Sequence, residues 1–193
     1  MLFRSSFVHH GHDSDLCRTL GVLPGWHAGI AHLAHARIHK RDLGRVACLS
    51  AEGLPVTRYF LGSASFGLSA ATARALGRAR IARLFGHGFA TGLHRLVVRG
   101  RWRATRIRLM SDSYDEIAGI ASVSVAPKQG LFDMRVLDGA DRPDQARSFR
   151  TARLTAAPTV DTNAPVDVEC DGEATGVLPA TFEIIPAAIN LRI

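Results

Sequence analysis

The chain has 193 residues, of which 47% are hydrophobic and 21% are charged. This length and balance fit one ordinary folded domain, or one domain with part of another, and they exclude wholesale disorder. The formal net charge is +7, and arginine dominates it because lysine occurs only at Lys40 and Lys128. Such a surplus favours anionic partners (phosphorylated nucleotides, acidic lipid surfaces or nucleic acid) without choosing among them.

Three widely spaced cysteines limit the redox chemistry. Cys17, Cys48 and Cys170 are odd in number and form no C-x-x-C pair, so neither a disulfide framework nor a thiolate zinc site is expected.

The sequence has no apolar run of about 18 residues, which a spanning helix needs, and residues 1–12 lack the apolar centre of a signal peptide. We expect a cytoplasmic protein and leave peripheral contact with a membrane surface open.

The front of the chain predicts helices. Ser14-Asp15 can cap a short helix, and Pro24-Gly25 opens a second one whose apolar residues recur at helical spacing as far as Ile38. Residues 68–84 form the longest helical stretch, rich in Ala, Leu and Arg, and a shorter helix follows to about Val97.

The rest of the chain predicts short strands separated by turns. Apolar Ile107 and Leu109 alternate with Arg106 and Arg108, which is the period of a half-buried strand. The expected strands are 46–49, 57–61, 103–110, 117–125, 131–137, 148–155, 166–170 and 181–185. Six or more short strands with one helical insertion favour an α+β protein built mainly as an antiparallel β-sandwich.

One hairpin near the end carries the clearest candidate for chemistry. Residues 166–169 alternate apolar and acidic side chains, and Asp171-Gly172 makes a tight turn because glycine accepts a positive φ. Glu173 then follows directly, so its carboxylate is expected on a rigid hairpin. From spacing alone, an exposed turn residue is the simpler interpretation of Glu173.

Five segments share a pattern when they are taken together and in order. They are Gly11-His12-Asp13-Ser14-Asp15-Leu16-Cys17-Arg18, Asp42-Leu43-Gly44-Arg45-Val46, Phe60-Leu61-Gly62-Ser63-Ala64-Ser65-Phe66-Gly67-Leu68-Ser69-Ala70, Ala126-Pro127 with Gly130-Leu131-Phe132-Asp133, and Asp171-Gly172-Glu173 with the stretch to Pro186-Ala187-Ala188-Ile189. Together they resemble the diacylglycerol kinase and sphingosine kinase-like lipid kinases of bacterial type. The resemblance covers about residues 9–193, and it is the joint order that makes it specific.

The resemblance implies two domains. Residues 1–41 would be a helical remnant of an α/β nucleotide-binding domain, and residues 42–193 the C-terminal β-sandwich domain of a lipid kinase. It also implies ATP-dependent phosphorylation of a lipid hydroxyl of the diacylglycerol or sphingoid type, with ATP and Mg²⁺ as cofactors. Phosphoryl transfer needs a metal, donors around the phosphates, and a carboxylate that deprotonates the attacking hydroxyl.

The same resemblance implies roles for six residues. Glu173 would be the catalytic carboxylate. Asp171 and Gly172 would lie at the nucleotide and Mg²⁺ side of the cleft. Gly11, Ser14 and Asp15 would border the ATP phosphates, at a helix N-terminus that suits anions.

The chain departs from the family pattern in several places. It contains no G-G-D-G-T motif, which should lie upstream of Gly11, where only ten residues stand. Asp13 brings a negative charge beside the phosphates, and Gln129 replaces an aspartate of the family's structural Mg²⁺ loop, so we expect no metal there. We therefore expect the chain to be inactive alone, with a separate chain as a candidate source of the missing nucleotide-binding half and a lipid substrate at a membrane surface as its partner.

Other interpretations stay open. A non-catalytic lipid- or nucleotide-binding module would keep the fold without the reaction. A basic β-sandwich that binds nucleic acid is a less favoured alternative. A metal site on the helical face of His32, His35 and His39 is also less favoured. The last feature is a basic helix side, which is either a solvated face or a surface that attracts nucleotide or anionic lipid headgroups; it consists of Arg74, Arg78, Arg80 and Arg83. The oligomeric state, including a homodimer, cannot be assigned from the sequence.

Overall fold

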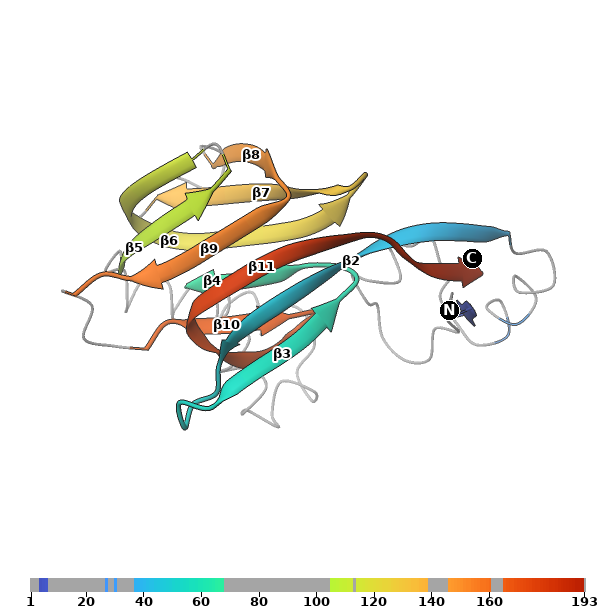
Figure 1. Ribbon diagram of the computed structural model, residues 1–193, viewed down its shortest axis with the longest axis horizontal. Helices are drawn as coiled ribbons and strands as arrows, with labels where there is room; N and C mark the ends of the chain where they lie inside the picture. Colours follow the sequence, from blue (N-terminus) through green and yellow to red (C-terminus); the bar gives the residue numbers. More distant parts are fainter. Residues whose placement is uncertain are drawn as a thin grey trace.

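The structure is a computed structural model, and it describes residues 4–6, 27, 30, 37–67, 105–112, 114–138, 146–160 and 165–192. The elements in this part of the chain are strands (Figure 1). They are β1 (Arg4–Ser6), β2 (Ile38–Leu49), β3 (Pro55–Phe60), β4 (Ala64–Gly67), β5 (Thr105–Ser111), β6 (Tyr114–Lys128), β7 (Leu131–Asp138), β8 (Arg147–Thr151), β9 (Arg153–Pro158), β10 (Asp167–Cys170) and β11 (Glu173–Arg192).

The strands form a single sheet that closes on itself. Eight of its 11 strands follow the order β10-β4-β6-β5-β9-β11-β2-β3, and the additional pairing of β10 with β11 joins the two sides into a closed barrel. The pairings around this ring are antiparallel. Strands β7 and β8 extend the sheet from β6, and the short β1 pairs in parallel with the end of β11.

The expected α+β class is therefore wrong. The elements that the structure describes are strands that close into an antiparallel barrel, and His27 and Ile30 are the described residues with helical backbone, so these elements are not the expected α+β sandwich with a helical insertion and a helical remnant. Ile38, expected at the end of a front helix, instead begins β2. The other helices expected from the sequence lie mostly outside the described residues. No described helix is long and apolar enough to cross a membrane.

The barrel interior holds one apolar cluster drawn from nearly every strand. In β5 the alternation expected from the sequence is confirmed: Ile107 and Leu109 are fully buried, and Arg106 and Arg108 are exposed. Two pairs of stacked rings join distant strands, Phe60 with Phe132 at 5.9 Å and Phe66 with Phe182 at 5.6 Å between centroids. Burying each such ring contributes about 1.5–3 kcal/mol of transfer free energy.

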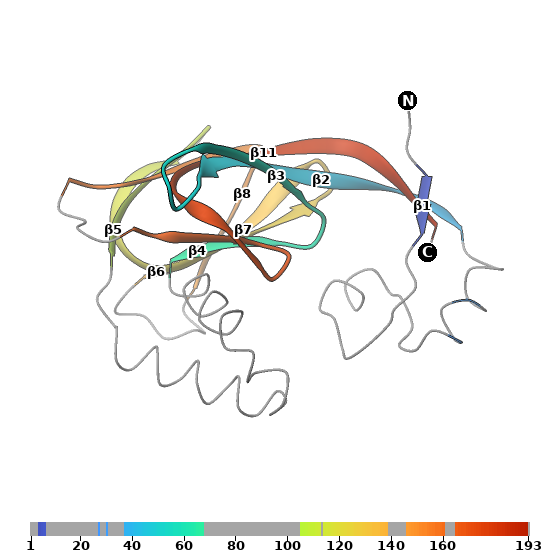
Figure 2. The ribbon, with the colours of Figure 1, turned by 90° about the horizontal axis from the view of Figure 1, so that it is seen from below.

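An arm of three strands extends from one end of the barrel (Figure 2). Residues 38–41 of β2 pair with residues 189–192 of β11, and β1 pairs with the same end of β11. Leu191 is fully buried there, yet it does not belong to the barrel cluster. Strand β2 runs through the expected domain boundary at 41/42, and the division into two domains stays a prediction.

Candidate functional site

The β10–β11 hairpin forms the turn that the sequence predicts. Asp171 and Gly172 have φ angles of 49° and 86°, and Cys170 pairs with Glu173 across the turn. Glycine tolerates a positive φ freely, and aspartate tolerates it better than most residues do. Strand β10 also pairs with β4, so β10 lies between β4 and the long strand β11.

The Asp171 side chain binds the loop between β3 and β4. Its Oδ2 accepts a hydrogen bond from the backbone N–H of Leu61 at 2.9 Å. Its Oδ1 accepts from the N–H groups of Gly62 and Ser63, each at 2.9 Å. The backbone N–H of Asp171 donates in return to the Ser63 carbonyl at 2.8 Å. Three consecutive amides that converge on a carboxylate form an anion nest, which Asp171 itself occupies.

Glu169 adds a second attachment two residues earlier. Its Oε1 accepts from the backbone N–H of Gly172 at 2.8 Å, and its Oε2 accepts from the Ser65 hydroxyl at 2.9 Å. Ser65 belongs to β4 and is the register partner of Glu169. The two carboxylates together join the hairpin turn to residues 61–65.

Glu173 differs from these two carboxylates. It is exposed, and among the described residues its carboxylate has no hydrogen-bond or ion-pair partner. The contact recorded for Glu173 is through its backbone carbonyl, which accepts from the Thr175 hydroxyl at 3.2 Å. A carboxylate held on a fixed turn and directed to solvent can accept a proton from a bound hydroxyl group.

The inner side of the hairpin is closely packed. A Cβ added at Gly176 would lie 2.2 Å from the backbone oxygen of Leu49 and 2.8 Å from Sγ of Cys48, so only glycine fits there. Burial is the main reason that the pKa of the Cys170 thiol is raised to about 12. Burial likewise raises the pKa of the Cys48 thiol, so both described cysteines are inert, protonated thiols.

The structure describes only half of the expected site. Asp171, Gly172 and Glu173 lie together on the hairpin. Gly11, Ser14 and Asp15 lie outside the described residues, so their approach to the hairpin stays a prediction. The roles of all six residues likewise stay predictions.

The histidine face expected from the sequence is described only in part. His39 is exposed in β2 and His27 is also exposed, whereas His32 and His35 lie outside the described residues. In the part of the chain that the structure describes, no three His, Cys, Asp or Glu side chains gather closely enough to hold a metal ion.

Asp42 has a structural role that its place in a sequence motif does not reveal. Its Oδ2 accepts from the backbone N–H of Gly130 at 2.7 Å, and its Oδ1 accepts from that of Ala187 at 2.8 Å. Gly130 lies in the β6–β7 turn, and Ala187 lies in an irregular part of β11, each with a positive φ. Asp42 therefore satisfies backbone amides in two irregular segments, where strand pairing does not satisfy them. Sequence patterns do not reveal this role, because the two partners are 88 and 145 residues away in sequence.

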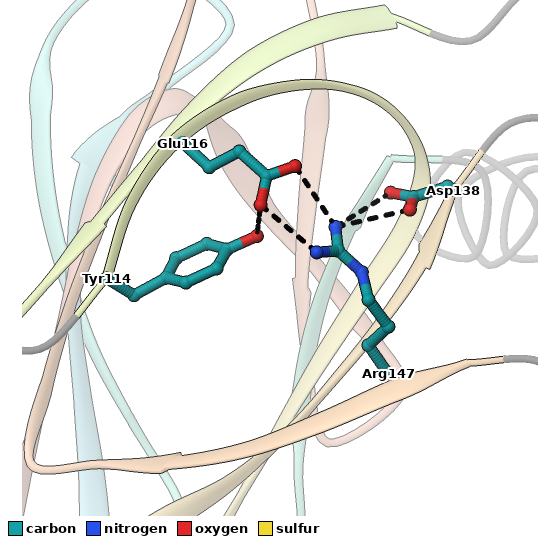
Figure 3. A network of polar contacts seen from close by, with 4 residues as sticks. All are labelled: Tyr114, Glu116, Asp138 and Arg147. Carbon is teal, nitrogen blue, oxygen red and sulfur yellow. Dashed lines mark hydrogen bonds and ion pairs between the residues drawn. The ribbon is translucent and has the colours of Figure 1, made fainter.

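A second polar network, around Arg147, lies away from the hairpin on β6, β7 and β8 (Figure 3). Arg147 donates to Glu116 at 3.1 and 3.3 Å and to Asp138 at 3.3 Å, and the Tyr114 hydroxyl donates to Glu116. The hydrogen bonds from Arg147, followed by that from Tyr114, lower the pKa of the Glu116 carboxyl. Because every carboxylate in this network is paired with a cation, the network fastens strands to one another and offers no free carboxylate for chemistry.

Comparison with solved structures identifies relatives of this barrel. A structure assigned as a diacylglycerol kinase from Bacillus anthracis str. Sterne matches with a TM-score of 0.66 at 15% sequence identity, over 97% of this chain and 68% of that chain. Two further structures assigned to diacylglycerol kinases of the same organism match at 15% identity with TM-scores of 0.59 and 0.62, over 92% of this chain and 63% and 64% of theirs. No family model and no curated protein matches the sequence.

These matches establish the fold alone. The chain has a diacylglycerol kinase-like fold, as the motif order predicted. It spans roughly two thirds of the length of the chains that it matches.

Proposed function

We propose that this chain supplies the β-barrel half of a lipid kinase site, which transfers the γ-phosphoryl group of ATP to a lipid hydroxyl. The observation that carries the proposal is Glu173, an exposed carboxylate without a partner among the described residues, on a hairpin held by two other carboxylates. The kinase-like fold and the order of the sequence motifs support the same reaction.

In this proposal Glu173 is the general base. The lipid hydroxyl must lose a proton as it attacks the phosphoryl group, and a positioned carboxylate contributes typically 10²–10⁴-fold to such a step. Mg²⁺ bound with ATP would neutralise the charge of the phosphates. The described residues supply one candidate carboxylate for the base and none of the glycine-rich amides that would surround the phosphates, so ATP and Mg²⁺ binding depend on further residues.

The proposal includes a dependence on a second nucleotide-binding segment. The sequence contains no G-G-D-G-T motif, and backbone amides of such a glycine-rich loop are what cradle phosphates. We therefore propose that the chain transfers no phosphoryl group until such a segment, in the same or a separate chain, completes the site. A lipid substrate would place the working complex at the cytoplasmic surface of a membrane.

The test is transfer of radiolabelled phosphate from ATP to diacylglycerol in mixed micelles with Mg²⁺. The chain is compared with a form extended upstream until it includes a glycine-rich phosphate loop. Transfer is expected only from the extended form, and Glu173→Gln is expected to reduce it by about 10²–10⁴-fold. Glu52→Gln, another exposed glutamate in a hairpin turn, is the matched control and should leave the rate unchanged.

Two outcomes would contradict the proposal. Robust transfer by the chain alone would remove the dependence on a second segment, and full activity of Glu173→Gln would remove the general base. If the extended form bound liposomes but neither bound nor hydrolysed ATP, the chain would be a non-catalytic lipid-binding module.

A further inference from the structure

We propose that Asp171 is a positioning residue, whose carboxylate fixes the hairpin against residues 61–63 and thereby sets the position of Glu173. This inference rests on the proposed function for the role of Glu173, but the attachment itself is independent of any activity. It gives Asp171 a task distinct from binding metal or nucleotide.

Most of the hydrogen-bonding capacity of the Asp171 carboxylate is already in use. Two carboxylate oxygens offer about four acceptor positions. Backbone amides of Leu61, Gly62 and Ser63 occupy three of them, each at 2.9 Å. One acceptor position is left, so a Mg²⁺ ion that used more than one lone pair of Asp171 would displace an amide, which would then lose its acceptor.

The backbone conformation of the turn also needs support from its surroundings. Asp171 has a φ of 49°, a region that costs free energy for a residue with a Cβ. Such a conformation persists where the surroundings determine it. The surroundings here are the contacts of the Asp171 carboxylate, its N–H bond to Ser63, and the bond from Gly172 to Glu169.

The path along the chain from Asp171 to the carboxylate that it would position is short. Glu173 follows two residues later, with Gly172, which adds no side-chain contact, between them. The exposed Glu173 side chain has no partner of its own among the described residues, so its location depends on the backbone of the turn. A misplacement of about 1 Å at a reacting group can cost about 10²-fold in rate.

Hydrogen exchange of the chain as it stands tests the attachment directly. Asp171→Asn is the informative variant, because asparagine also tolerates a positive φ while its amide removes the charge and one acceptor. Exchange at the amides of Leu61, Gly62, Ser63 and Gly172 is expected to accelerate by at least about tenfold, with little change in strands β5 and β9. Asp112→Asn, at the β5–β6 turn, is the matched control and should change none of these amides.

A double-mutant cycle in the active, extended form tests the route through Glu173. Asp171→Asn is expected to lower kcat about 10–10²-fold while the KM for Mg·ATP and the Mg²⁺ concentration for half-maximal rate stay unchanged. In the Glu173→Gln background, Asp171→Asn should cause no further loss, since the residue that it positions is already removed.

Each result has one interpretation. Unchanged exchange at residues 61–63 in Asp171→Asn would overturn the proposal whether or not the protein is active. A raised KM for Mg·ATP with kcat retained, or independent losses in the double variant, would instead make Asp171 a ligand of the nucleotide or its metal. Full activity of Glu173→Gln would contradict the proposed function, while accelerated exchange would still show the attachment.

Discussion

Gly44 shows how one small residue sets the packing of the barrel. It lies in β2 opposite Phe60, and a Cβ at this position would lie 2.1 Å from the Phe60 ring. That ring is 1% exposed and stacks on Phe132, so it has no free space into which it can move. The absence of a side chain at Gly44 is therefore a packing requirement.

The substitution Gly44→Ala should lower the free energy of unfolding by about 1–3 kcal/mol, because an added methyl group overpacks a dense core. Urea denaturation measures this loss. In the background of Phe60→Leu, which shortens the side chain, the added cost of Gly44→Ala should shrink, since residues in contact are coupled. An equal cost in both backgrounds would show that the ring is not the obstacle.

Tyr114 should titrate well above its ordinary pKa. Burial, together with the hydrogen bond to Glu116, raises the pKa of its phenol to about 12, above the usual value of about 10. Because the folded pKa is the higher one, this stabilisation is complete below about pH 10 and is lost as the pH rises through 12.

Absorbance at alkaline pH measures the titration of Tyr114. The chain has two tyrosines, so Tyr59→Phe leaves Tyr114 as the sole reporter. The expected midpoint of its ionisation is near 12 in the folded protein. A midpoint near 10, while circular dichroism still reports native strands, would contradict the buried, hydrogen-bonded position.

At the scale of elements, Asp42 joins the β6–β7 turn to the irregular part of β11. In Asp42→Asn the amide nitrogen can accept no hydrogen bond, so either Gly130 or Ala187 loses its acceptor. We expect a loss of about 1–3 kcal/mol in stability and faster exchange at one of these two amides. Urea denaturation and amide exchange report the two effects, and slow exchange at both amides would show that another group satisfies them.

The local chemistry of the hairpins could be predicted from sequence, and the lengths of the strands could not. Asp171-Gly172 has the dipeptide that a tight turn favours, and the turn is where the sequence places it. Strand β11, in contrast, was expected over residues 181–185 only and extends from Glu173 through Pro186 to Arg192. Proline is tolerated there because the pairing of β11 with β2 skips from Ile185 to Ile189, so no ladder hydrogen bond is required of it.

At the scale of the whole molecule, ring closure is what sequence periodicity could not reveal. Alternation shows that a strand has one buried face, but a sandwich and a barrel share that pattern. Closure depends on β11 pairing with both β9 and β10, a choice between partners that no local signal specifies. Prediction of the candidate site from sequence had the same limit. Glu173 follows a recognisable turn, whereas the hydrogen-bond partners of Asp171 lie more than a hundred residues earlier in the sequence.

The barrel and the arm should differ in local stability. The barrel strands β5, β6 and β9 bury their side chains in one cluster, whereas Ile38, His39 and Lys40 of the arm are exposed. Native-state hydrogen exchange should show barrel amides that exchange only through global unfolding, with rates that rise steeply with urea. Amides of residues 38–41 should exchange through smaller openings that urea hardly affects. Identical urea dependence in both regions would mean that they unfold as one unit.

Strand β11 also connects the arm to the hairpin that presents Glu173. It runs without a break in the chain from Glu173 to Arg192, and its pairing with β2 shifts register between Val177 and Thr181 and between Ile185 and Ile189. At the second shift Asp42 accepts a hydrogen bond from the backbone N–H of Ala187. The hairpin that presents Glu173 lies beyond both shifts, so the arm and this carboxylate stand at opposite ends of one continuous strand.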